Sequence, residues 1–228
     1  MDPKLHLSHL IGEHEVFRAC LDEDLTAPVK TCGDWDLRDL AEHLGQSNMW
    51  VATAVAEGHG DYPRPPAPSG RDEFLDWFDG TTDALVSALS ADPGEPAWSF
   101  APPGTVGFWR RRRALETLVH RWDAELALGA TGPLDPELSG DGVAEVFEVM
   151  APRQIARGRA VAPTVALRLA ATDLGAEWTY GPGEPVATLS GRAEDLLLLL
   201  WGRVSRDGFA WDGDRIAGGL VLDGPLTA

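Results

Sequence analysis

TVGFWRRRRALETLVHRWDAELALG, residues 105–129, is the stretch of this sequence that decides the fold, because it predicts one long amphipathic helix. Gly129, suited to a left-handed cap, ends the helix. Glu116 and His120 stand four residues apart on one face, directly beside the apolar stripe. A carboxylate and an imidazole are costly to bury there unless they are paired or bound to a metal. The stripe itself consists of Leu115, Leu118, Val119, Trp122 and Leu126.

A second helix is predicted from WDLRDLAEHLGQS, residues 35–47, and ends near Gly58. Asp36 is a good N-cap, and Asp39 lies in the first turn, where the helix dipole favours a negative charge. His43 stands between two leucines, at the edge of this helix's apolar stripe.

His43, Glu116 and His120 together have the composition of a metal site. Two imidazoles and one carboxylate suit a zinc, nickel, iron or manganese ion that keeps an open coordination position. Spacing alone leaves another interpretation open, because a Glu and a His four residues apart are common by chance. The pair would then be a surface hydrogen bond, and His43 a histidine at the margin of the core.

The rest of the chain predicts an α+β fold: an all-helical N-terminal domain in residues 1–158 and a small α/β domain in residues 159–228. Residues 59–70 and 92–104 are rich in proline and glycine and are predicted to be loops. Further helices are expected at 4–25, 71–91, 141–157 and 193–203, and strands at 164–171, 177–180, 186–189, near 209–211 and near 220–222.

The formal net charge of −17 makes nucleic acid and membranes poor partners for this protein. The longest apolar run, residues 196–201, is far shorter than the roughly 20 residues of a spanning helix. The first residues lack the pattern of a signal peptide, so we expect a cytoplasmic protein. Cys20 and Cys32 stand in no CxxC motif, and we expect both to be reduced.

Three segments resemble a known family: WDLRDLAEHLG (35–45), RRRALETLVHRWDAELALG (111–129) and GRAEDLLLLLWGR (191–203). They look like the DinB-like superfamily, specifically its mycothiol-dependent maleylpyruvate isomerase branch, and the likeness covers nearly the whole chain. It implies a DinB-type four-helix bundle that carries a divalent metal, usually zinc, on two histidines and a glutamate. By motif match these ligands are His43, Glu116 and His120, so the resemblance favours the metal site.

Four further residues are candidates around this site. Asp123 is three residues past His120 and can accept a ring N–H from a histidine ligand. The alternative is that Asp123 forms only a salt bridge with an arginine. Arg112 and Arg113, one turn before Glu116, can attract an anionic cosubstrate or can be a solvated face. The resemblance implies that an arginine of the C-terminal domain reaches the active site, and Arg203 is the candidate. Its alternative role is to stabilise a helix C-terminus.

These features predict an enzyme that binds a small thiol, mycothiol by the resemblance, and uses it on a small, anionic electrophile as an S-transferase or isomerase. A metal-dependent hydrolase is the first alternative, with Asp123 or Glu42 as general base. A non-catalytic module that binds a small ligand is the second. The expected partners are the small-molecule thiol and the electrophile, and the expected state is a monomer or a homodimer.

Overall fold

A computed structural model describes residues 3–227, and the chain divides into two compact units, 1–132 and 133–228. The first unit is helical and the second contains a sheet, which confirms the α+β class. The border between the units falls earlier in the chain than the expected boundary near residue 158. The first helical segment after residue 133 (Pro136–Glu145) packs against helix α7 (Ala193–Leu200), and the next two segments follow it, so all three belong with the sheet.

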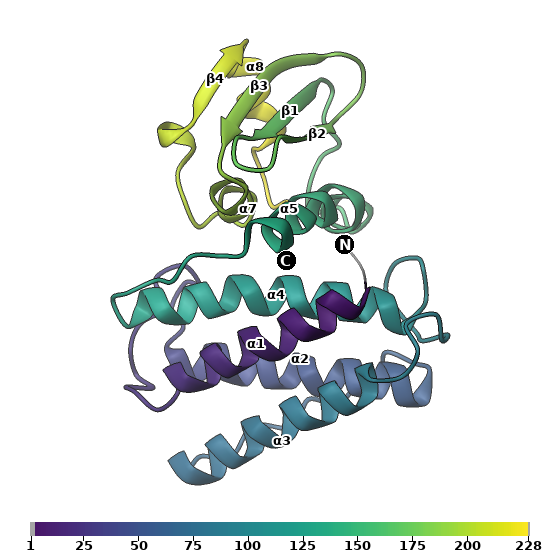
Figure 1. The fold of residues 1–228 in the computed structure, drawn as a ribbon, viewed down its shortest axis with the longest axis vertical. Helices are drawn as coiled ribbons and strands as arrows, with labels where there is room; N and C mark the ends of the chain where they lie inside the picture. Colours follow the sequence, from purple (N-terminus) through teal and green to yellow (C-terminus); the bar gives the residue numbers. More distant parts are fainter. Residues whose placement is uncertain (1–2, 228) are drawn as a thin grey trace. The chain divides into compact units, whose positions relative to one another are not determined.

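In the first unit, the described residues form four long helices (Figure 1). Helix α1 ends five residues before its predicted end, because the chain turns after Cys20, whereas the other three match the predicted spans closely. Their bounds are α1 Pro3–Cys20, α2 Leu37–Glu57, α3 Arg71–Leu89 and α4 Val106–Ala127.

The ends of α2 follow from its sequence. The Asp36 carboxylate accepts from the backbone N–H of Asp39, and the Asp39 carboxylate accepts from that of Asp36, which forms a capping box. At the other end, Gly58 adopts the left-handed conformation with φ of 73°. These two caps fix the register of α2 and so the direction in which His43 points.

Helices α2 and α4 run antiparallel. His43 is beside His120 near one end of the contact, and Trp50 is beside Trp109 near the other, with ring centroids 5.3 and 5.1 Å apart. The residues of both helices that face this contact therefore form one continuous strip of side chains.

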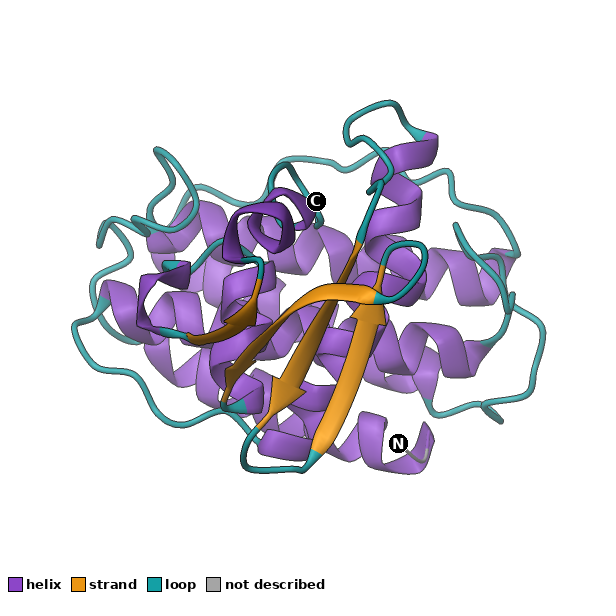
Figure 2. Cartoon of the chain, turned by 90° about the horizontal axis from the view of Figure 1, so that it is seen from above, coloured by secondary structure: helices purple, strands orange, loops and turns teal. Residues whose placement is uncertain are grey.

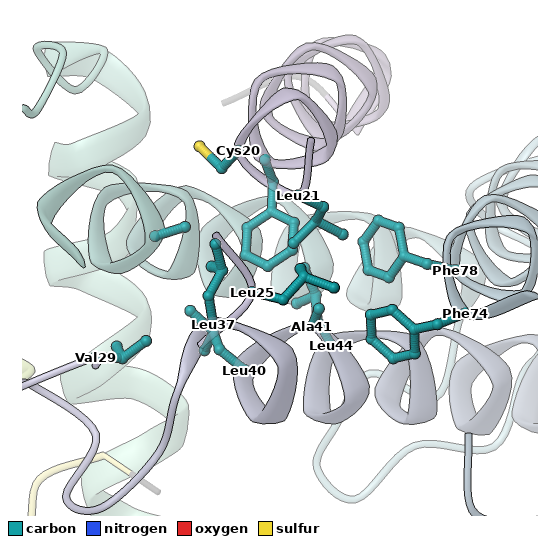
Figure 3. Close-up of a cluster of buried hydrophobic side chains, with 12 residues drawn as sticks. Cys20, Leu21, Leu25, Val29, Leu37, Leu40, Ala41, Leu44, Phe74 and Phe78 are labelled. Carbon is teal, nitrogen blue, oxygen red and sulfur yellow. The ribbon is translucent and has the colours of Figure 1, made fainter. Parts of the chain in front are cut away.

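The core beside this strip is apolar. Phe74 and Phe78 of α3 point toward Leu21 and Leu25, which follow α1 (Figure 3). All four side chains are at least nine-tenths buried, and each buried side chain of this size stabilises the fold by roughly 1.5–3 kcal/mol. The core thus holds α1, α2 and α3 together and gives the strip of side chains between α2 and α4 a rigid support.

The loop of residues 59–70 lies along α2. Side chains at every fourth position of the helix bind its backbone: Trp50 Nε1 donates to Gly60 O at 2.8 Å, and Glu42 Oε1 accepts from Ala67 N at 3.1 Å. Gln46 and Arg38 donate to the carbonyls of Pro65 and Pro68. The loop is therefore a strap fixed to one side of α2.

The second unit contains a four-stranded sheet of order β2-β1-β3-β4 (Figure 2). Strand β1 pairs antiparallel with β2 and parallel with β3, and β3 pairs antiparallel with β4. The helices and strands of the second unit are α5 Pro136–Glu145, a π-helical segment Val146–Met150, α6 Ala151–Ala156, β1 Ala166–Ala171, β2 Ala176–Tyr180, β3 Pro185–Gly191, α7 Ala193–Leu200, β4 Ala210–Gly213 and α8 Arg215–Val221.

The strand predicted near residues 220–222 is wrong, because these residues belong to or follow helix α8. The Asp214 carboxylate caps this helix by accepting from Ile216 N and Ala217 N. Gly218 lets the helix approach the sheet closely, since an added Cβ would lie 2.9 Å from the Cβ of Ala187. A short apolar run without a clear period did not distinguish helix from strand.

The buried His14 on α1 makes the stability of the fold dependent on pH. Its exposed fraction is 2%, and burial, reinforced by the charge of Arg113, lowers its pKa to about 3. The unfolded chain therefore takes up a proton below about pH 6.5 that the folded chain refuses until about pH 3. Stability contributed by the neutral ring is lost as the pH falls through this window.

We expect wild-type protein to lose about 2 kcal/mol of unfolding free energy through His14 between pH 7 and pH 5. His14→Leu removes this component, so its stability should fall less over the same range, as measured by chemical denaturation. His59→Gln, at an exposed histidine, is the control and should behave as wild type. An equal pH dependence of His14→Leu and wild type would contradict the prediction.

Candidate metal centre

The three predicted ligands come together on α2 and α4. One donor atom from each of His43, Glu116 and His120 lies within 4.8 Å of the others. His43 Nε2 is 3.4 Å from Glu116 Oε1, and the two imidazole rings meet edge to face at 82°. Antiparallel packing thus assembles residues that are more than 70 positions apart in the sequence.

Arginines hold the second carboxylate oxygen of Glu116. Oε2 lies 2.7 Å from Arg113 Nη1 and 3.5 Å from Arg112 Nη2. Burial alone would raise the pKa of Glu116, but these guanidinium charges, with a smaller contribution from His43, place it well below its usual value. The carboxylate is therefore ionised, with Oε1 directed to His43.

Arg113 is itself fixed on both sides. Its side chain is buried, and Nη2 donates to Asn48 Oδ1 at 2.7 Å and to the Leu44 carbonyl at 3.5 Å. Burial lowers the pKa of Arg113, and the adjacent Glu116 opposes that shift. Arg113 therefore joins α2 to the ligand Glu116 on α4.

His120 has a carboxylate behind its ring. Its Nδ1 is 3.0 Å from Asp123 Oδ2, a buried oxygen, so we assign the ring proton to Nδ1 and the free lone pair to Nε2. Burial lowers the pKa of His120, more strongly than Asp123 raises it. A neutral imidazole with a fixed tautomer is the form that binds a metal.

Asp123 also accepts from a turn that precedes α2. Thr31 Oγ1 donates to Oδ1 at 2.6 Å, and Cys32 Sγ lies 3.7 Å from Oδ2. The turn is closed by the hydrogen bond from Val29 N to Trp35 O at 2.8 Å, and Trp35 packs on the ring of His43. No sequence pattern indicates Thr31 or Cys32 at this site, because both are remote in the chain from residue 123.

Access to the three ligands is uneven. The side chain of His43 is 31% exposed, that of Glu116 16% and that of His120 6%. A small molecule that reaches a bound ion would therefore approach at the His43 end. Trp50 and Trp109 lie two helical turns away along the same strip, within a cluster of aromatic rings.

The other predicted residues differ in their placement. Arg112 and Arg113 contact Glu116 in the interior, so their direct contact with a cosubstrate stays a prediction. Glu42 is turned to the strap, where it accepts from Ala67 N. Arg203 belongs to the second unit and donates to the Trp201 carbonyl at 2.8 Å, and its role at the active site also stays a prediction.

The donor set fits a divalent metal ion. Two imidazoles and one ionised carboxylate, whose donor atoms lie within 4.8 Å of one another, are typical of sites with three protein ligands and one open position. The residues behind them also fit, since Asp123 orients His120 and Arg113 supports Glu116.

Comparison with known proteins first defines the class. Residues 7–125 match the family described as mycothiol maleylpyruvate isomerase N-terminal domain, and residues 137–219 match the corresponding C-terminal domain. The chain belongs to the mycothiol maleylpyruvate isomerase family.

The solved structures that it resembles have the same fold. A crystal structure of the mycothiol-dependent maleylpyruvate isomerase matches with a TM-score of 0.68 and 14% identity, over 93% of each chain. A histidine-to-alanine mutant of that isomerase matches with a TM-score of 0.66 and 13% identity, also over 93% of each chain.

Two sequence relatives are uncharacterised proteins from two strains of Mycobacterium tuberculosis. Each is 28% identical over 127 residues, which is 54% of this chain. The matched region spans 65% of the length of these relatives.

Replacing Asp123 tests the support of His120. We expect Asp123→Asn to weaken zinc binding by roughly 10- to 100-fold, because the charge that holds the Nδ1 proton is lost. Competition with a chromogenic chelator measures the dissociation constant. Asp79→Asn, which removes a carboxylate paired with Arg18, is the control and should bind zinc as wild type does. Equal affinities for all three proteins would contradict the proposed support.

Proposed function

We propose that this protein is a metal-dependent enzyme that acts on a small anionic electrophile with the help of a small thiol, mycothiol in the cell. It either transfers the thiol to the electrophile or uses the thiol to isomerise it. The observation that carries the proposal is the assembly of His43, Glu116 and His120 within a chain of the mycothiol maleylpyruvate isomerase family. The reaction is proposed to take place in the cytoplasm.

His43, Glu116 and His120 would hold the ion, which we expect to be zinc from the family resemblance and the donor set. When bound, a divalent ion supplies a Lewis acid that lowers the pKa of a coordinated thiol. The thiolate adds to an electrophilic carbon of the substrate. For an isomerase, the adduct rotates about the former double bond and the thiol leaves, whereas for a transferase the thiol stays attached.

The residues around the ligands keep them ready for this role. Asp123 holds the proton on Nδ1 of His120 and so leaves the opposite nitrogen free. Arg113 and Arg112 keep Glu116 ionised. We propose that the positive charges of Arg112 and Arg113 also favour an anionic thiol or substrate near the ligands. Arg203 is proposed to take part in catalysis.

A hydrolase on the same scaffold finds less support. Such an enzyme needs a carboxylate that is free to act as general base. Asp123 is buried and accepts from Thr31 and His120, and Glu42 accepts from the strap at Ala67. Both candidate bases are thus engaged in hydrogen bonds that position other groups.

Elemental analysis together with thiol conjugation tests the proposal. We expect about one divalent ion per chain and consumption of mycothiol with at least one member of a panel of activated alkenes and alkyl halides. His43→Ala removes a ligand, so both the bound ion and the thiol consumption should be lost. His59→Ala changes an exposed histidine away from the three ligands and should retain both.

Two results separate the parts of the proposal. Metal-loaded protein that consumes no thiol with any electrophile would remove the thiol-dependent activity. Full activity in His43→Ala without bound metal would remove the role of the ion.

A further inference from the structure

His120 faces a second set of donor atoms. Besides His43 and Glu116, it lies with Cys32 and Asp123 in a group whose donor atoms are all within 4.8 Å of one another. Asp123 Oδ2 is at the centre of this group, 3.0 Å from His120 Nδ1 and 3.7 Å from Cys32 Sγ. The imidazole of His120 is therefore shared by two clusters of ligand-type side chains.

We propose that Cys32, Asp123 and His120 form a second site, for a thiophilic divalent cation, that competes with the first site for His120. Ligands of a tetrahedral zinc-like ion with sulfur at about 2.3 Å and nitrogen or oxygen at about 2.0 Å lie about 3.3–3.5 Å apart. The two distances around Asp123 Oδ2 lie on either side of that range. Small side-chain movements would complete the site.

The turn before α2 holds Cys32 in place for this role. The backbone N–H of Cys32 donates to the Val29 carbonyl at 2.8 Å, and Gly33 adopts a left-handed conformation with φ of 71°. Thr31 Oγ1 occupies the other oxygen of Asp123, Oδ1, which leaves Oδ2 directed to Cys32 and His120. Cys32 is half-buried rather than fully enclosed.

The chemistry of the second site differs from that of the first. A thiolate is a soft ligand that favours ions such as cadmium and zinc, whereas the first site offers only nitrogen and oxygen. At the second site a sulfur–metal bond forms as the Cys32 thiol releases its proton to solvent. The proton of His120 leaves Nδ1 while Nε2 takes one up, so the ring stays neutral and one proton is released per ion.

Competition between the sites follows from the shared ring. An ion on Nδ1 places the proton of His120 on Nε2, which then has no lone pair for the ion held by His43 and Glu116. Occupation of one site therefore excludes His120 from the other. A thiophilic ion in excess would switch off any activity that depends on the first site.

Titration of metal-free, full-length protein with cadmium tests the second site through the ultraviolet thiolate-to-cadmium charge-transfer band. We expect a band in wild type that is lost in Cys32→Ser. Cys20→Ser is the matched control and should keep the band, because burial raises the pKa of Cys20 to about 11 and its sulfur donates to the Val16 carbonyl. A band that persists in Cys32→Ser would overturn the proposal.

His43→Ala separates the two sites, since this residue belongs to the first site alone. This variant should keep the cadmium–thiolate band even though it loses the ion of the first site. Absence of the band in both wild type and His43→Ala would overturn the second site and leave the proposed function untouched.

Competition is measured on wild type. Zinc at ten times its dissociation constant for the first site should weaken cadmium binding at Cys32 by about tenfold in wild type, and by clearly less in His43→Ala, which lacks that site. Two ions per chain together with a full thiolate band would overturn the exclusion. Cadmium should also slow the alkylation of Cys32 by a maleimide, a reaction that peptide mass mapping monitors. An unchanged rate of alkylation in wild type would overturn the second site.

Discussion

The ion pair between Arg113 and Glu116 is the interaction on which the arrangement of the site depends. A buried guanidinium contacts the carboxylate of its own helix and, through Asn48 and the Leu44 carbonyl, the neighbouring helix α2. Removing one member of such a pair leaves a buried charge without compensation, which costs about 3–5 kcal/mol. The same contact that joins the two helices therefore also determines which oxygen of Glu116 faces His43.

A second layer of contacts holds each imidazole ring in place. His43 is packed against Trp35, and His120 is held by Asp123, which in turn is held by Thr31. The turn of residues 28–36 thus packs on His43 directly and supports His120 through Asp123. These contacts connect the short segment before α2 with the middle of α4. Loss of order in the turn would therefore loosen two metal ligands at once.

The periodic parts of the chain could be predicted from the sequence, and the contacts between remote parts could not. Asp36 and Gly58 marked the ends of α2 because capping is a local property. The likeness of two helical motifs to a known family also indicated which three residues meet. In contrast, no local signal connects Cys32 with Asp123, since their contact depends on how a turn folds back onto a distant helix. The short run at 220–222 failed for a related reason, because its helical state depends on the Asp214 cap and on packing against the sheet.

The strap along α2 has a consequence for how such proteins can diverge. Trp50, Gln46, Glu42 and Arg38 all bind backbone atoms of the strap rather than its side chains. Substitutions within residues 61–68 can therefore change the size and polarity of this border without loss of its attachment. Side chains of the strap can therefore change small-molecule preference while the hydrogen bonds to its backbone, and the neighbouring metal-ligand residues, stay as they are. Helix α2 provides these hydrogen bonds, so the effect of each substitution in the strap stays at the surface.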